Sequence, residues 1–243
     1  ERAGHQYKSQ TDTETIIHLY EEKGIDCLRY LDGEFAFCVW DAKKKIFFCA
    51  RDRLGVKPFY YYVSDKHFIF ASEIKAILLH PNLNRKLDKQ ALSDYLSFSV
   101  SPAPLTLFKD IFKLKAGHFL LVDNNGAGAQ RQYWDALPKQ KIKCSLDEAI
   151  EGVRLKLDES IKERMMSDVP FGVFLSGGID SSANVAFMSR MMKEPVKTFT
   201  IAIEGQENYS ENYFADSVSR HFGADAHSIR INFEDFRKLF SDL

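Results

Sequence analysis

Residues 173–182 read VFLSGGIDSS, a short apolar run that passes into two glycines, an aspartate and two serines. The pattern indicates a strand that ends in a tight loop, followed by a helix that begins near Asp180. Because Gly177 and Gly178 have no side chains, a ligand can approach the backbone, and successive N–H groups can bind an anion where the helix begins. Neutral donors are added by the hydroxyls of Ser176, Ser181 and Ser182.

Asp180 distinguishes this loop from a simple anion site. A carboxylate beside a phosphate would repel it unless a divalent cation such as Mg²⁺ lies between them. The loop also lacks the lysine of G-x-x-x-x-G-K-[ST], which reaches the β and γ phosphates, so it indicates pyrophosphate binding rather than γ-phosphoryl transfer. The alternative is a tight glycine turn followed by a serine or aspartate helix cap, which occurs in many α/β proteins.

Around this loop, the second half of the chain alternates strands and helices. The pattern predicts helices over 145–166, 180–192, 211–222 and from 233 onward, and strands over 171–176, 196–203 and 227–231. Ser145 and Glu148 fit a capping box at the start of the first of these helices. Such alternation predicts a parallel sheet with helices on both faces, and parallel sheets bind ligands at the carboxyl ends of their strands.

The first half has the pattern of an antiparallel meander. Short aromatic and β-branched runs at 31–40, 45–50, 59–63 and 67–72 predict its strands, and 119–134 predicts a hairpin. Helices are predicted over 11–24 and 88–98. Thr11 and Glu14 fit a capping box for the first of them, and Gly24 suits a left-handed closing position.

Composition excludes several classes of protein. The 243 residues are 45% hydrophobic and 28% charged, with a formal net charge of -1. This composition is globular and gives no support for a nucleic-acid surface. No apolar run approaches the roughly 20 residues of a membrane helix, so we expect no membrane partner and a cytoplasmic protein. Because the first residue is Glu1 and not Met, we also expect a fragment.

Several longer motifs carry a family resemblance. SGGIDSS resembles the pyrophosphate loop of the N-type ATP pyrophosphatases, and residues 167–182, SDVPFGVFLSGGIDSS, are similar to the glutamine-hydrolysing asparagine synthetases. Residues 12–41, DTETIIHLYEEKGIDCLRYLDGEFAFCVWD, with 50–61 and 70–78, are similar to the class II glutamine amidotransferase domain of those enzymes. The two halves stand in the order of the family.

The resemblance implies two folds. Residues 1–138 correspond to the C-terminal part of an α+β, Ntn-hydrolase-like amidotransferase domain with antiparallel sheets. Residues 139–243 correspond to the N-terminal part of an asparagine synthetase domain, an α/β doubly wound parallel sheet of the adenine nucleotide alpha hydrolase type. We expect both domains to be incomplete.

The resemblance also implies an ATP-dependent carbon–nitrogen ligase with ATP and Mg²⁺ as cofactors. In that family, ammonia from glutamine attacks a β-aspartyl adenylate, giving asparagine, AMP and pyrophosphate. The expected partners are glutamine, ATP and aspartate or another carboxylate acceptor, and a homodimer is compatible with the family. Two alternatives stay open: a non-catalytic nucleotide-binding module, and a relative such as a β-lactam synthetase or an amidotransferase acting on a glycan or peptide.

Family positions can be assigned residue by residue. The ATP-pyrophosphate positions fall on Ser176, Gly177, Gly178, Asp180 and Ser181, with Asp180 also on the Mg²⁺ position. The adenosine positions fall on Phe174, Leu175 and the strand from Phe199 to Ile201, which includes Thr200. Asp12 falls on the position that holds the α-amino group of glutamine; from spacing alone it is a helix cap. We interpret Arg51, Asp52 and Lys57 as a charged structural turn.

The glutaminase nucleophile of the family is an N-terminal cysteine whose own α-amino group acts as base. Because Cys27, Cys38, Cys49 and Cys144 are all internal, no catalytic residue is assigned, and we expect this chain to release no ammonia from glutamine. The histidines show no metal-ligand spacing along the sequence, so we expect each to be satisfied or solvated.

Overall fold

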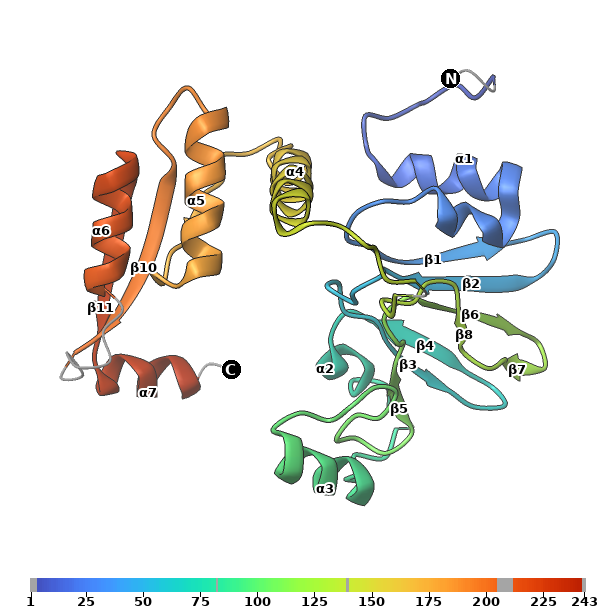
Figure 1. Cartoon of the computed structure of the whole chain (residues 1–243). Coiled ribbons are helices and arrows are strands. Elements are labelled where there is room, and N and C mark those ends of the chain that lie inside the picture. Colours follow the sequence, from blue (N-terminus) through green and yellow to red (C-terminus); the bar gives the residue numbers. More distant parts are fainter. Residues whose placement is uncertain (1–3, 82, 139, 205–211, 242–243) are drawn as a thin grey trace. The chain divides into compact units, whose positions relative to one another are not determined.

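The computed structural model describes residues 4–81, 83–138, 140–204 and 212–241. It consists of two compact units, Glu1–Lys141 and Ile142–Leu243, which are described separately (Figure 1). Within the described residues no helix is both long and apolar enough to cross a membrane.

The first unit contains two antiparallel sheets. Its helices are α1 (Thr13–Lys23), η1 (Gly24–Arg29), α2 (Ile74–Ile77) and α3 (Lys89–Phe98). Its strands are β1 (Ala36–Asp41), β2 (Ile46–Arg51), β3 (Tyr60–Val63), β4 (Phe68–Ala71), β5 (Ile111–Lys113), β6 (His118–Asp123), β7 (Gly126–Ala127) and β8 (Arg131–Gln132). The larger sheet has the order β1-β2-β6-β7, with β8 also on β6, and the smaller has the order β4-β3-β5.

The predicted single meander is wrong, because β2 pairs with β6 and not with β3. The turn between β2 and β3 sends the chain into the other sheet. Gly55 in this turn has a φ of +68°. The Arg51 guanidinium donates to the carbonyls of Gly55, Lys57 and Leu114 at 2.6–2.7 Å, which fixes the turn against the segment between β5 and β6. The expected charged structural turn is therefore observed at Arg51.

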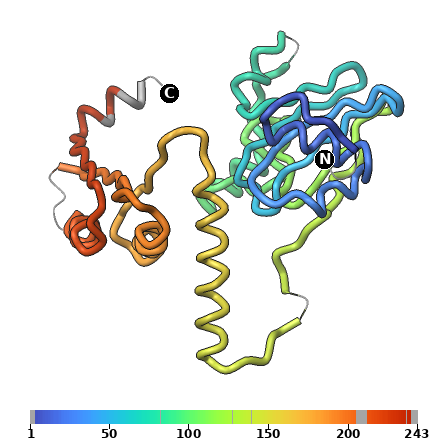
Figure 2. Tube along the Cα trace, turned by 90° about the horizontal axis from the view of Figure 1, so that it is seen from above, coloured from blue at the N-terminus to red at the C-terminus, as the bar shows by residue number. Residues whose placement is uncertain are grey.

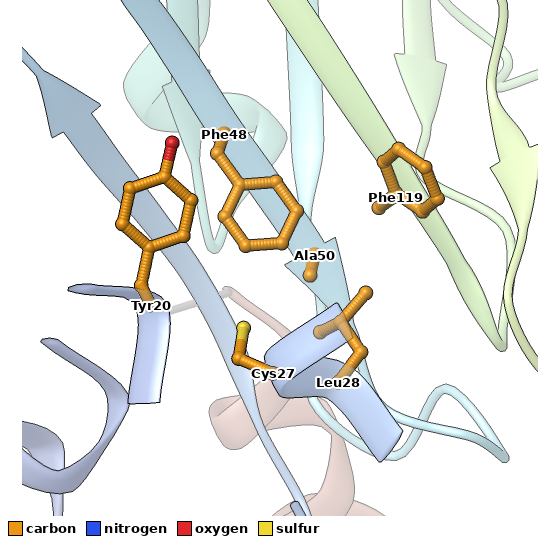
Figure 3. Packing of buried hydrophobic residues seen from close by; sticks show 6 residues of the cluster. All are labelled: Tyr20, Cys27, Leu28, Phe48, Ala50 and Phe119. Atoms are coloured by element: carbon orange, nitrogen blue, oxygen red, sulfur yellow. The ribbon is translucent and has the colours of Figure 1, made fainter. Parts of the chain in front are cut away.

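The two faces of β2 serve two cores. On one face Phe48 and Ala50 are fully buried against Tyr20 of α1 and against Cys27 and Leu28 of η1 (Figure 3). On the other face Cys49 packs with side chains of the smaller sheet, including Tyr61. Because side chains alternate along a strand, the larger sheet lies between a helical layer and the second sheet. Truncating a fully buried ring such as Phe48 costs about 3–5 kcal/mol in protein cores.

Helix α1 does not begin with the predicted capping box. The Glu14 carboxylate accepts hydrogen bonds from the backbone N–H groups of Lys8 and Ser9, both at 2.8 Å, instead of the N–H of Thr11. Its hydrogen bonds, led by the one from the Ser9 hydroxyl, lower the pKa of Glu14 to about 2. Gly24 ends the helix with a φ of +56°, as predicted, but its ψ of -134° lies outside the left-handed helical region.

The second unit is a parallel sheet with its helices. The elements are α4 (Leu146–Arg164), β9 (Val173–Phe174), α5 (Ile179–Met191), β10 (Lys197–Ile203), α6 (Asn212–Phe222), β11 (Asp225–Ile231) and α7 (Phe233–Ser241). The strand order is β11-β10-β9, and both pairings are parallel. The predicted capping box at the start of α4 is confirmed, with Ser145 and Glu148 bonded reciprocally.

Helices α5 and α6 lie side by side on this sheet (Figure 2). Leu175, Val185 of α5 and Ala215 of α6 form one buried cluster. Along β10 the residues Thr198 and Ala202 are buried, whereas Ile201 on the opposite face is 61% exposed. Among the described residues these helices cover one face of the sheet, and the doubly wound arrangement with helices on both faces stays a prediction. A doubly wound sheet reverses its strand order, and the three described strands follow each other in one direction.

Candidate functional site

The glycine-rich loop lies where β9 ends and α5 begins. The strand pairing continues one residue beyond β9, because the Leu175 N–H donates to the Phe199 carbonyl at 2.9 Å. The Leu175 side chain is fully buried under the loop. The loop residues Ser176, Gly177 and Gly178 follow, at the carboxyl end of a parallel strand. This is the edge at which open parallel sheets bind ligands.

Serine hydroxyls hold the loop closed. The Ser176 N–H donates to the Ser181 hydroxyl at 3.3 Å, and the two hydroxyls lie 3.1 Å apart. The Gly178 N–H donates to the Ser176 hydroxyl at 3.3 Å, and the Ser181 hydroxyl donates to the Gly178 carbonyl at 3.2 Å. These bonds bring together the ends of the predicted motif. The Ser182 hydroxyl oxygen is buried and has no hydrogen-bond partner within the described part of the chain.

Gly177 cannot carry a side chain in this loop. Its φ is +84°, and an added Cβ would lie 2.5 Å from the Phe214 Cβ and 2.7 Å from the Ala215 backbone nitrogen. Gly178 has an ordinary φ of -69°, and an added Cβ would contact the Ser176 hydroxyl at 3.4 Å. The first glycine is therefore required by the fold, whereas the second leaves room above the backbone.

The start of α5 is suited to an anion. Gly178 is the N-cap residue and offers no side-chain acceptor to the N–H groups of the first turn. Such N–H groups and the helix dipole together favour a phosphate or carboxylate. Asp180 is the acidic residue of this turn, and it is exposed. Its carboxylate and the hydroxyls of Ser176 and Ser181 are oxygen donors, which fits the preference of Mg²⁺ for few protein oxygen ligands.

The predicted adenosine residues differ in their surroundings. Phe174 is 79% exposed, and its ring lies 6.4 Å from that of Phe199 between centroids. Leu175 points into the core, so its side chain does not reach the surface above the loop. The Thr200 hydroxyl donates to the Leu175 carbonyl at 2.8 Å. Thr200 therefore ties the loop strand to its neighbour, a role that its position on an apolar strand did not indicate.

A second candidate site lies in the first unit, around Asp12. A cavity of about 660 Å³ is lined by the first turn of α1, by residues 30–37 and by Lys57. Asp12 is the N-cap residue of α1, but its side chain accepts no capping hydrogen bond. The reading of Asp12 as a helix cap is therefore wrong, and its exposed carboxylate lies at the cavity wall.

The cavity holds charges of both signs. Asp32 and Glu34 line it beside Gly33, whose φ of +128° shapes the turn that carries them. The Lys57 ammonium lies 3.8 Å from the Glu34 carboxylate. Such a wall matches a small zwitterion, whose ammonium group pairs with carboxylates. The sequence analysis did not predict Asp32 and Glu34 as site residues, although two acidic residues on either side of a glycine could have indicated a polar turn. It assigned Lys57 to the structural turn.

Asp52 behaves as the sequence predicted. It is 1% exposed, and its carboxylate accepts hydrogen bonds from the N–H groups of Leu54, Val56 and Lys57 at 3.2, 2.9 and 2.9 Å. Its backbone carbonyl accepts another from Gly117 at 2.8 Å. The residue organises the turn from within and lies outside the cavity lining.

Two family models match the chain. A glutamine amidotransferase domain matches residues 1–134, and asparagine synthase matches residues 152–243. The two matches fall in the two structural units.

Curated relatives match nearly the whole chain. A Methanocaldococcus jannaschii protein, provisionally named asparagine synthetase 2 (glutamine-hydrolyzing), is 39% identical over 94% of this chain and 45% of its own length. Asparagine synthetase 3 (glutamine-hydrolyzing) of Bacillus subtilis is 39% identical over 85% of this chain and 34% of its own length. The amidase chyE of Penicillium rubens is 31% identical over 98% of this chain and 37% of its own length. The chain thus spans less than half the length of these relatives.

Proposed function

Because this chain belongs to the family of glutamine-hydrolysing asparagine synthetases, we propose that it is part of an ATP-dependent ligase that makes asparagine. Glutamine is hydrolysed to glutamate and ammonia. The β-carboxylate of aspartate attacks ATP, which gives a β-aspartyl adenylate and releases pyrophosphate. Ammonia then displaces AMP. The observation that supports this proposal is the loop at the start of α5, where the N-cap glycine offers no side-chain acceptor to the first N–H groups and two serine hydroxyls lie 3.1 Å apart.

The loop residues have separate roles in this proposal. The N–H groups at the start of α5 and the hydroxyls of Ser176 and Ser181 bind the pyrophosphate portion of ATP. Gly178 allows the phosphates to approach the backbone. Asp180 holds a Mg²⁺ ion, which would neutralise charge on the phosphate oxygens as pyrophosphate leaves. We propose that this unit belongs to the adenine nucleotide alpha hydrolase type, with its parallel order β11-β10-β9 as support.

Phe174 and Phe199 have the positions and exposure to pack against an adenosine ring. Phe174 lies directly before the loop, and Phe199 is 39% exposed on the neighbouring strand. Leu175 and Thr200 act indirectly. The Leu175 side chain packs beneath the loop. The Thr200 hydroxyl donates a hydrogen bond to the Leu175 carbonyl and so fixes its position.

In this proposal the first unit is the part of the enzyme that binds glutamine. We assign it to the Ntn-hydrolase-like class, for which its layer of helices on one of two antiparallel sheets is the support. Asp12 would pair with the α-amino group of glutamine in the cavity that it lines. Lys57 and Glu34 in the same wall are further polar groups near this position.

A second candidate function is amidation of another carboxylate. The 31% identity to the Penicillium rubens amidase favours this function. That match covers 98% of the chain, and the relative is named an amidase and not an asparagine synthetase. Both candidates activate a carboxylate with ATP. An ATP–pyrophosphate exchange assay on the product of the complete reading frame separates them: exchange that depends on aspartate supports the first, and exchange that appears only with other carboxylates supports the second.

Nucleotide binding can be tested on this chain directly. We expect calorimetry to detect Mg²⁺-dependent ATP binding that Asp180→Asn abolishes, because the amide cannot supply the charge that holds the metal. Circular dichroism should be unchanged, since Asp180 is exposed. Asp168→Asn, an exposed acid outside the loop, is the matched control. Unchanged ATP binding in Asp180→Asn would contradict the metal role, and no ATP binding at all by the native chain would contradict the loop assignment.

A further inference from the structure

Two histidines that are distant in sequence meet beside α1. His5 lies on the segment ahead of the helix, and His18 lies within it. Their ring centroids are 4.5 Å apart, and both side chains are mostly buried, at 25% and 18% exposure. Glu21, one turn after His18, completes the cluster. Sequence spacing could not indicate this site, because the folding of the 4–12 segment onto the helix creates it.

Three ligand atoms converge in this cluster. The His5 Nδ1 lies 3.8 Å from the Glu21 Oε2, and the His18 Nδ1 lies 3.4 Å from the same oxygen. The three residues each offer a ligand atom, all within 4.8 Å of one another. In a tetrahedral zinc site, ligand atoms at the usual metal distances lie about 3.3 Å apart. The observed separations are therefore close to those of an assembled site.

The other nitrogen of each ring faces a carboxylate. The His5 Nε2 lies 3.0 Å from the Glu22 Oε1, and the His18 Nε2 lies 3.3 Å from the Glu14 Oε1. These carboxylates favour a proton on Nε2 in both rings. In the neutral rings each Nδ1 then offers a lone pair beside the Glu21 oxygen, and these three atoms can ligate one cation. Histidine metal ligands usually have a carboxylate or carbonyl on their second nitrogen, which fixes the tautomer.

We propose that His5, His18 and Glu21 bind a divalent transition-metal ion of the zinc class. Two imidazole nitrogens and one carboxylate oxygen are a donor set that zinc accepts, with water as a fourth ligand. Imidazole selects against Mg²⁺ and Ca²⁺, which prefer oxygen. None of the three residues lines the Asp12 cavity.

The metal joins two segments of the first unit. Its ligands come from α1 and from the segment ahead of it, and Glu14 links the same two segments through the N–H groups of Lys8 and Ser9. Metal binding therefore fixes the stretch that leads directly into Asp12. The role is structural, because the metal joins His5 on the leading segment to His18 and Glu21 of α1.

The test uses the whole chain in a Cys144→Ser background, which removes the exposed thiol as a competing ligand. After chelator treatment, Zn²⁺ is titrated by calorimetry, and Co²⁺ is added as a spectroscopic probe. We expect one tight Zn²⁺ site and a Co²⁺ absorption spectrum of four-coordinate nitrogen and oxygen ligation. His18→Gln and His5→Gln should each weaken Zn²⁺ binding at least about 100-fold and remove the spectrum, because a ligand is lost.

Two further variants distinguish ligation from general damage. Glu22→Gln should weaken Zn²⁺ binding about 10–100-fold, because it removes the charge behind His5 without removing a ligand. His221→Gln, an exposed histidine of α6, should leave Zn²⁺ binding unchanged. Circular dichroism of the metal-free variants should match that of the parent. Equal Zn²⁺ affinity in His18→Gln and the parent, or no saturable Zn²⁺ binding by the parent, would overturn the proposal.

Discussion

Gly177 lies so close to the start of α6 that a Cβ on it would be 2.7 Å from the Ala215 backbone nitrogen. The contact joins the loop after β9 to the second helix of the unit. Two features therefore require glycine at this position: the close approach of neighbouring backbone and the φ of +84°. Neither atom of this contact can move away as the end of a flexible side chain could.

Gly177→Ala should lower the free energy of unfolding by about 2–3 kcal/mol, because it adds both a strained φ and a clash with backbone. Gly152→Ala is the matched control, since Gly152 lies in the exposed interior of α4 with open space around its Cβ position. There alanine should raise the free energy of unfolding by about 0.5–1 kcal/mol. Urea denaturation of both variants measures the difference. Equal changes in the free energy of unfolding for the two variants would show that the close approach of Gly177 to α6 does not affect stability.

Gly178→Ala should separate stability from binding. The φ of Gly178 is -69° and the nearest obstacle to a Cβ is 3.4 Å away, so the free energy of unfolding should change by less than about 1 kcal/mol. The methyl group would occupy the space through which phosphates approach the α5 N–H groups. ATP affinity measured by calorimetry should therefore fall at least about tenfold. A variant that binds ATP as the parent does would contradict the proposed phosphate position.

Asp52→Ala should destabilise the first unit by about 2–4 kcal/mol, because three N–H groups of the turn lose their shared acceptor. Asp32→Ala provides the comparison. The Asp32 side chain is 77% exposed and lies 3.6 Å from Arg53, so its loss should cost less than about 0.5 kcal/mol. Thermal unfolding followed by circular dichroism compares the two. Similar melting temperatures would refute the central role of Asp52 in the turn.

Tyr20 gives the first unit an alkaline sensitivity. Burial, together with its 2.9 Å hydrogen bond to Asp41, raises the pKa of Tyr20 from 10.0 to about 12. Its contribution is fully present below pH 10 and is lost as the pH rises toward 12, because the unfolded chain ionises first. Tyr20→Phe should cost about 1 kcal/mol at pH 8.

The same comparison at pH 11 should show a smaller cost of Tyr20→Phe, measured by urea denaturation at both pH values. Tyr30→Phe is the control, because Tyr30 is 63% exposed. A cost that grows with pH would reverse the sign of the proposed linkage.

Predictions from the local sequence were correct where neighbouring residues alone determine the structure. The reciprocal capping box of Ser145 and Glu148 involves residues three positions apart, and it forms as predicted. The positive φ of Gly24 was predicted for the same reason. Both depend on backbone conformation within a single helical turn.

Predictions from local sequence patterns failed where contacts between distant segments determine the structure. Glu14 has the spacing of a capping residue, but Lys8 and Ser9 fold back and occupy its carboxylate. Strand pairing failed similarly, because no local pattern says that β2 pairs with β6. The side chain of Leu175 packs in the core under the loop, and its expected place beside adenosine stays a prediction.

The pairing of β2 with β6 has a consequence for biosynthesis. As the first unit emerges from a ribosome, β1 and β2 can form their hairpin early, but Cys49 meets its partner Leu120 only after the whole smaller sheet has been made. Until then one edge of β2 has unpaired backbone groups, and such edges are prone to association between chains. The Arg51 hydrogen bond to Leu114 likewise joins residues 63 positions apart. Slow, non-local closure of this kind is the step during which a nascent chain most needs protection from its neighbours.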